Sequence, residues 1–220
     1  MGAFKGVGEF FKQPLWKVAE SMNYSEDNII VLKGDIDQLE KKFPDTYDNL
    51  ISCVHHADRR KPIEYGQDLV ASWLIEDHFL SVLSSDKYDL YLGGADRNRR
   101  ILPDVKTSAT SDFLVVKGDR HRKLELMNDY TGFWARSGKL HLRDAKYTQL
   151  QKDKALFIAI STTTGEFAIY DFRNEIPAKY IQSHKFYGYK PAYELDITRS
   201  MLKPISKENM AAAILELMEK

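Results

Sequence analysis

The sequence predicts an α/β protein, in the α+β sense of helices flanking a mixed, mostly antiparallel sheet. Three observations support this class. Residues 63–83 carry apolar side chains at helical spacing. Three short apolar runs, at 112–116, 124–127 and 140–142, are separated by polar, glycine-containing breaks and are too short for helices. A helical pattern and then an apolar strand pattern follow within residues 147–160.

Composition bounds the classes of protein that the chain can represent. Its 220 residues are 43% hydrophobic and 29% charged, which is typical of a soluble globular protein. The formal net charge is zero, so any site for a polyanion must come from local clusters of Lys and Arg. A single cysteine excludes an internal disulfide and a multi-cysteine zinc site. No apolar run approaches the ~20 residues that span a membrane, so we expect a soluble, cytoplasmic protein.

Residues 1–61 are expected to form a mainly helical N-terminal lead-in. Helices are predicted at 15–22, 36–42 and 46–54, and the apolar run at 28–32 is predicted to be a strand.

The long helix at 63–83 opens after Pro62, which suits the first turn of a helix. Glu64 and Asp68 stand one turn apart, opposite the apolar stripe that contains Trp73. They are interpreted as solvated residues near the helix start, and alternatively as accessory groups that face a metal site.

The remaining elements follow in order. Strands are expected at 88–92, in the meander formed by the three apolar runs, and at 155–160 and 166–170, with a short helix at 147–154 between the meander and these last strands. Residues 173–220 form a C-terminal extension with a terminal helix capped by Ser206. Since no repeat or low-complexity linker interrupts the chain, residues 1–220 are treated as one domain with a core at 62–172.

The first hairpin of the meander brings two acidic residues together. Asp112 and Glu125 are equally far from the turn at Gly118 and Asp119, so they should be cross-strand neighbours with Cβ atoms about 5 Å apart. Carboxylates this close repel each other unless one is protonated or a cation binds between them. An oxygen-only pair suits Mg²⁺ or Mn²⁺.

A second hairpin, centred near Ser137, suggests another acidic pair. It would place Asp129 nearly opposite Asp144, and Lys146 would share a strand face with Asp144. Two acids and a lysine in this arrangement can bind a metal and hold a charged nucleophile or a phosphate beside it.

An aspartate at the start of one strand, followed by Asp or Glu-x-Lys on its hairpin partner, resembles the PD-(D/E)xK nuclease superfamily. This superfamily is also called restriction endonuclease-like and includes Holliday junction resolvases. The helix at 63–83, the meander and the following helix and strand match its αβββαβ core, over residues 62–172. The resemblance implies a hydrolase that cleaves DNA phosphodiester bonds with Mg²⁺ or Mn²⁺.

Two registers of the motif compete. In the first, Asp129 is the leading aspartate, and Asp144-Ala145-Lys146 supplies the acid and the lysine. In the second, Asp112 and Glu125 are the acidic pair.

The second register has Met127 where the family keeps its lysine. Reflection about Ser137 places Lys146 beside Met127, so a composite site of Asp112, Glu125 and Lys146 joins the two registers. A migrated lysine of this kind is known in the superfamily.

The resemblance also implies roles for the other parts of the site. A bound metal would activate a water molecule, and Lys146 would stabilise the hydroxide or the charge on the transition state. Gln149, on the following helix, is a candidate contact to the DNA backbone. The expected partner is double-stranded or branched DNA, and a homodimer is compatible with this interpretation. Recombination, repair or restriction in a prokaryote or phage would be the setting.

Loop-borne basic clusters would supply the contacts to DNA. They are Arg59-Arg60-Lys61, Arg97 with Arg99-Arg100, and Arg120 with Arg122-Lys123. Three alternatives stay open. In the first, the acids are plain strand-end partners of these basic residues. In the second, which Met127 favours, the chain is a catalytically inactive nuclease-fold protein that binds nucleic acid or assists assembly. In the third, it is an interaction domain without a nucleic-acid role.

Overall fold

A computed structural model describes residues 13–53, 61–94, 97–103, 111–129, 131–161 and 163–220. The chain divides into two compact units. The unit called here the sheet unit contains Val82–Leu92 and Ser111–Lys220, and the unit called the helical unit contains the described residues of 13–81 and 93–103. The predicted boundaries at 61 and 172 differ from this division, because most of the long helix belongs with the N-terminal helices. Whether the two units behave as one domain stays a prediction.

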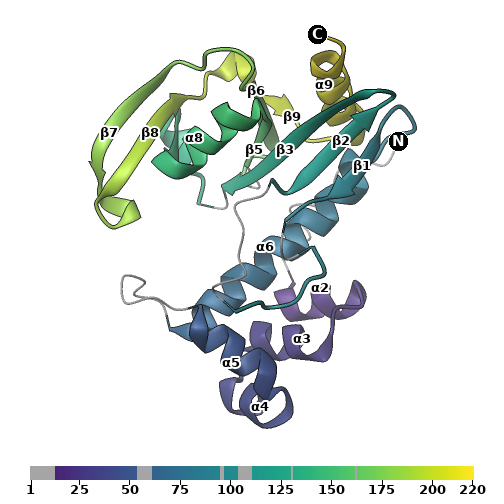
Figure 1. Ribbon diagram of the computed structural model, residues 1–220, viewed down its shortest axis with the longest axis vertical. Helices are drawn as coiled ribbons and strands as arrows, with labels where there is room; N and C mark the ends of the chain where they lie inside the picture. The colour runs from purple at the N-terminus through teal and green to yellow at the C-terminus, as the bar shows by residue number, and fades with distance from the viewer. Residues whose placement is uncertain (1–12, 54–60, 95–96, 104–110, 130, 162) are drawn as a thin grey trace. The chain divides into compact units, whose positions relative to one another are not determined.

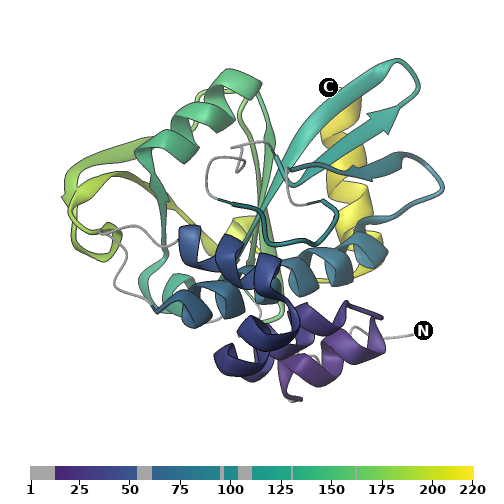
Figure 2. The same ribbon diagram turned by 60° about the horizontal axis from the view of Figure 1, so that its bottom comes forward.

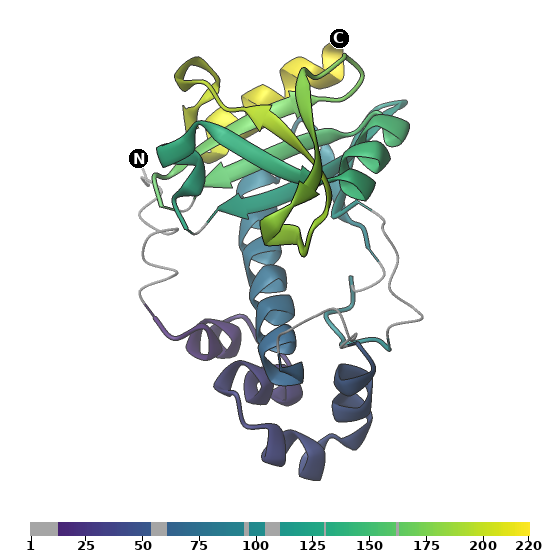
Figure 3. The ribbon, with the colours of Figure 1, turned by 90° about the vertical axis from the view of Figure 1, so that its left-hand side faces the viewer.

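The helical unit is built from short helices beside the first part of one long helix (Figure 3). They are α2 (Leu15–Ser21), α3 (Glu26–Lys33), α4 (Ile36–Lys42), α5 (Pro44–Ser52) and α6 (Pro62–Leu83). The predicted strand at 28–32 is wrong, since these residues lie within α3. Gly34 ends α3 in the left-handed conformation, with φ 77°, which a glycine adopts without steric cost.

The core of the helical unit forms where α6 meets the short helices. Gly66 permits this contact, because a Cβ atom at its position would lie 2.9 Å from a methyl group of Leu50 and 2.9 Å from one of Val31. The buried side chains are Ile30, Val31, Leu39, Leu50, Val70, Trp73 and Ile101.

The sheet unit contains a six-stranded sheet (Figure 1). Its order is β1 (Asp89–Leu92), β2 (Phe113–Lys117), β3 (Arg120–Asp129), β5 (Leu156–Ser161), β6 (Glu166–Asp171) and β9 (Lys203–Pro204). Neighbouring strands are antiparallel except β3 and β5, which are parallel. The fold is therefore α+β with a mixed, mostly antiparallel sheet, as the sequence predicted.

The second hairpin of the predicted meander does not form. After β3 the chain enters a short helix, α7 (Phe133–Ser137), and then β4 (Lys139–Arg143). β4 joins a separate three-stranded sheet with β8 (Lys190–Asp196) and β7 (Ala178–His184), in the order β4-β8-β7. The place beside β3 is taken by β5.

A helix and the three-stranded sheet share a core with the larger sheet. The helix is α8 (Asp144–Asp153), which starts three residues earlier than predicted. Its Tyr147 stacks on Tyr193 of β8, with ring centroids 4.0 Å apart and planes 18° apart. Buried residues of β5 and β6 complete this cluster: Phe157, Ala159, Ala168 and Tyr170. Figure 2 shows α8 and the terminal helix α9 (Lys207–Glu219) at separate places along the sheet.

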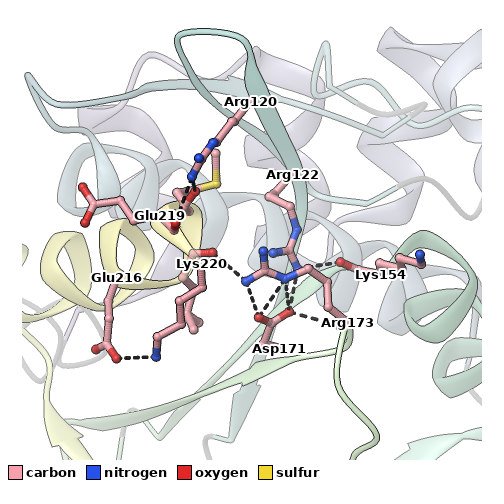
Figure 4. A network of polar contacts seen from close by, with 10 residues as sticks. Arg120, Arg122, Lys154, Asp171, Arg173, Glu216, Glu219 and Lys220 are labelled. Atoms are coloured by element: carbon pink, nitrogen blue, oxygen red, sulfur yellow. Dashed lines mark hydrogen bonds and ion pairs between the residues drawn. The ribbon is translucent and has the colours of Figure 1, made fainter.

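Arginine contacts tie α9 to the sheet (Figure 4). Arg120 Nη1 donates to the carbonyls of Met218 and Glu219 at 2.9 Å each. Arg173 bonds to the Leu217 carbonyl at 2.8 Å and to Asp171 at 2.6 Å, and Asp171 also pairs with Arg122. Within the described residues, no helix is both long enough and apolar enough to cross a membrane.

Candidate active site

The first hairpin has the predicted register. Phe113 pairs with Leu124, which continues the symmetry that sets Asp112 against Glu125 one step further along the strands. Asp112 immediately precedes β2 and is half-buried. Its Oδ2 atom accepts a hydrogen bond of 2.8 Å from the backbone N–H of Leu126, the residue after Glu125. This bond fixes the first carboxylate beside the second.

Glu125 is the chemically unusual residue of the sheet unit. It lies on a central strand and only 5% of it is exposed to solvent. Burial is the main cause that raises the pKa of its carboxyl, and the negative charge of Asp112 adds to the effect. The pKa reaches about 8, although an ion pair with Lys146 opposes the rise. A buried acid beside a second acid is an arrangement found more often at functional sites than in a structural core.

Lys146 completes the cluster from α8. Its ammonium group donates to Glu125 Oε1, while 44% of its side chain stays exposed. The neighbouring Tyr147 is buried in the shared core and anchors the first turn of the helix. Lys146 therefore reaches β3 from a helix, and the expectation that it lies on a strand and shares a face with Asp144 is wrong.

The composite register is the one that the fold assembles. The α8 face of β3 carries Glu125 and then Met127, which packs against the core cluster. Lys146 contacts Glu125 of this strand, so Asp112, Glu125 and Lys146 lie together. A second bridge joins the same two elements, since Lys123 of β3 lies 2.8 Å from Asp153 of α8.

Asp129 has a structural role in the turn after β3. Its Oδ1 accepts from the N–H and the hydroxyl of Thr131 at 2.9 and 2.7 Å, and its Oδ2 accepts from the N–H of Trp134 at 2.9 Å. Asp144 is the first residue of α8 and is half-buried. Because β3 and β4 belong to different sheets, the pairing that was to set Asp129 against Asp144 is absent.

The three accessory candidates make contacts within their own helices or next to them. Glu64 accepts from the backbone N–H of Lys61 at 2.9 Å, next to the start of α6 in the helical unit, and Asp68 lies one turn further along that helix. Gln149 of α8 donates to Asp153 of the same helix at 2.7 Å.

The predicted basic clusters are largely used within the fold. Arg120 and Arg122 hold α9 and Asp171, and Lys123 holds Asp153. Arg99 forms a pair with Glu76 at 2.7 Å and another with Asp77. Arg59 and Arg60 lie outside the described residues.

Sequence reasoning missed the backbone N–H of Leu126 as a member of the site. The hairpin register is the signal that could have found it, since an acid just before β2 faces the backbone of β3. The sequence matches no model of a known protein family, and comparison with curated proteins found no relative.

Proposed function

We propose that this protein is a metal-dependent DNA endonuclease of the PD-(D/E)xK type. The observation that carries the proposal is the cluster in which buried Glu125 lies between Asp112 and Lys146. The element order supports it. α6, β1, β2, β3, α8 and β5 follow the αβββαβ order of that superfamily, with α7 and β4 inserted before α8.

The donor set fits Mg²⁺ or Mn²⁺. Two carboxylates offer hard oxygen ligands, and one oxygen of Asp112 is already oriented by the Leu126 N–H. Among the described residues there is no group of three or more His, Cys, Asp and Glu side chains that could hold a metal. The proposed ion would rest on two carboxylates alone, since Mg²⁺ usually takes one or two protein carboxylates and leaves its other positions to water and to substrate phosphate.

The chain's own residues would divide the work as follows. Asp112 and Glu125 would hold the ion, which when bound lowers the pKa of water and neutralises phosphate charge. Glu125 would hold the ion as a carboxylate, its proton having passed to solvent, and Lys146 would then no longer be the only positive charge beside that carboxylate. The half-exposed ammonium group of Lys146 can then donate to the attacking hydroxide or to the phosphate oxygens, where negative charge grows in the transition state.

Plasmid cleavage with Mg²⁺ or Mn²⁺ tests the proposal. We expect Glu125→Gln and Lys146→Ala each to lower the rate about 100-fold or more, the scale of losing one electrostatic stabiliser. Asp144→Asn is the matched control, since the competing register makes Asp144 a metal ligand and the composite site does not. Its rate should stay within about threefold of the wild type.

Other outcomes would separate the alternatives. Loss of cleavage in Asp144→Asn, with cleavage kept in Glu125→Gln, would overturn the assignment of the site. DNA binding without cleavage under any metal would favour a catalytically inactive nuclease-fold protein. In such a protein, the ion pair between Glu125 and Lys146 would be a neutralised and purely structural pair.

A further inference from the structure

The β7–β8 hairpin differs from the rest of the sheet unit in its charge. Residues 178–193 contain three lysines and no aspartate or glutamate. Lys179, Lys185 and Lys190 are all exposed. The acids of β8, Glu194 and Asp196, follow at the end of the hairpin away from the tip, where both contact Lys139 of β4 and Glu194 pairs in register with Lys179 of β7. Residues 178–193, which include the tip of the hairpin, therefore present three exposed lysines with no acid among them, in a chain whose net charge is zero.

The tip of the hairpin holds an exposed aromatic residue in a strained conformation. The tip consists of the short 3₁₀ helix η2 (Lys185–Tyr187) and then Gly188 and Tyr189. Tyr189 has φ 66°, in the left-handed region that a tyrosine rarely adopts, and it is 67% exposed. A hydrogen bond of 3.0 Å from its N–H to the His184 carbonyl closes the turn. Strain at a side chain with so little packing suggests that the ring is held out for a partner.

Stacked tyrosines connect the hairpin to the candidate active site. Tyr180 of β7 is 51% exposed and meets Tyr193 of β8 edge to face, with ring centroids 5.3 Å apart. Tyr193 stacks on Tyr147, the residue after Lys146. The hairpin, seen as the long ribbon in Figure 1, thus contacts the helix that carries the proposed catalytic lysine directly through Tyr193, and Tyr180 lies one ring contact further away.

We propose that the β7–β8 hairpin is a DNA-binding arm of this site. The three lysines contact backbone phosphates, and Tyr189 packs against a sugar or an accessible base. A nucleic acid fits the tip of the hairpin better than a protein partner does, since Lys185, Lys190 and the exposed ring of Tyr189 have no acid between them in the chain and match a phosphate backbone. This inference rests on the proposed nuclease function and names the element that would position its substrate.

The salt dependence of DNA binding tests the lysines. The probe is a labelled duplex of about 30 base pairs, roughly three helical turns. Fluorescence anisotropy would be measured in EDTA, which prevents cleavage, between about 50 and 200 mM NaCl. Each lost phosphate contact lowers the slope of log K against log salt by about 0.9, so Lys179→Ala/Lys185→Ala/Lys190→Ala should lower it by roughly 2 to 3.

The matched control removes the same charge from another part of the sheet unit. Lys203→Ala/Lys207→Ala/Lys220→Ala changes three exposed lysines of β9 and the α9 region. Its slope should stay close to that of the wild type. Equal slopes in the two triple variants would refute the proposal that the hairpin binds DNA. A reduced slope in the hairpin variant would support the arm. If the same protein cleaved DNA with no metal, the proposed metal-dependent nuclease function would be refuted while the arm would stand. Absence of DNA binding by the wild type would refute both.

Tyr189 gives a second, independent test. Asn tolerates the left-handed conformation, so Tyr189→Asn should raise Tm by about 2–4 °C, the shift expected for a protein of this size when modest strain is relieved. The same variant should bind the duplex about tenfold more weakly, because a stacking ring is lost. Tyr189→Phe keeps the ring and should bind like the wild type. Wild-type affinity in Tyr189→Asn would show that the tip does not touch DNA.

Discussion

At the scale of single residues, the site contains one energetically unfavourable feature, a buried carboxyl beside a second acid. Glu125 is buried beside Asp112, and both factors disfavour its charged form. Lys146 offsets only part of this cost, since the pKa of Glu125 stays raised although the carboxyl is paired with this lysine. A divalent cation would offset more, which is the physical reason to expect metal binding here rather than at the other acids.

The raised pKa of Glu125 predicts how stability depends on pH without metal. Between pH 4.5 and about 8 the folded state keeps a proton on Glu125 that the unfolded state has lost. Stability therefore falls as pH rises through this window. One pKa unit is worth about 1.4 kcal/mol. The unfolding free energy of Glu125→Gln minus that of the wild type should therefore be larger at pH 8 than at pH 5, by at least about 1 kcal/mol.

Urea denaturation in EDTA at both pH values would measure this difference. Adding Mg²⁺ should stabilise the wild type and leave Glu125→Gln unchanged. A constant difference between the two proteins across the window would contradict the assigned pKa.

Asp129 provides a contrasting prediction at a structural acid. It accepts three hydrogen bonds from the turn before α7. Asp129→Ala should destabilise the protein by about 2–3 kcal/mol, because the Trp134 N–H is left buried without its partner. The cleavage rate per folded molecule should not change. A loss of activity at full stability would restore Asp129 to the candidate site.

At the scale of elements, close contacts decide how helices can be arranged. In α6, Gly66 lies against Leu50 and Val31. In the sheet unit, Tyr147 fixes the first turn of α8 and thereby the position of Lys146. Both are cases in which one side chain, or the lack of one, places a whole helix.

Gly66→Ala tests this view, because helix propensity and packing predict opposite signs. Alanine favours the helix by about 1 kcal/mol. The added methyl group would need the Leu50 and Val31 side chains to move, which costs about 1–3 kcal/mol. We expect a net loss in the free energy of unfolding, measured by chemical denaturation. Ser72→Ala, at an exposed position of α6, is the control and should change stability by no more than about 0.5 kcal/mol.

At the scale of the whole molecule, charge is balanced at 32 basic and 32 acidic residues. A chain with no net charge has no overall field that would attract DNA, so the proposed DNA binding would have to come from local surfaces such as the β7–β8 hairpin. Under the proposed function, metal binding and DNA binding would rest on different residues, so the two should separate in experiment.

Chelation tests that separation. EDTA should abolish cleavage while measurable duplex binding remains, and Mg²⁺ or Mn²⁺ should restore cleavage. Gel assays of cleavage and anisotropy of binding on the same samples would compare the two activities. Cleavage that persists in EDTA would exclude a metal-dependent mechanism.

The sequence by itself determined the local features. The β2–β3 register, and with it the adjacency of Asp112 and Glu125, follows from the symmetry of a hairpin about its turn. The long helix and the terminal helix follow from apolar periodicity and a cap at Ser206. These features depend on residues close in the chain, whose geometry backbone hydrogen bonding fixes.

Only the tertiary structure decided which lysine serves the acids. The predicted hairpin between β3 and β4 was wrong, because the chain passes through α7 into a second sheet and β5 pairs with β3 instead. Lys146 then reaches Glu125 because α8 packs on the sheet through Tyr147, while Asp129 is used by its own turn. Such contacts join residues far apart in sequence, and burial of a shared core selects them, which local pattern cannot predict.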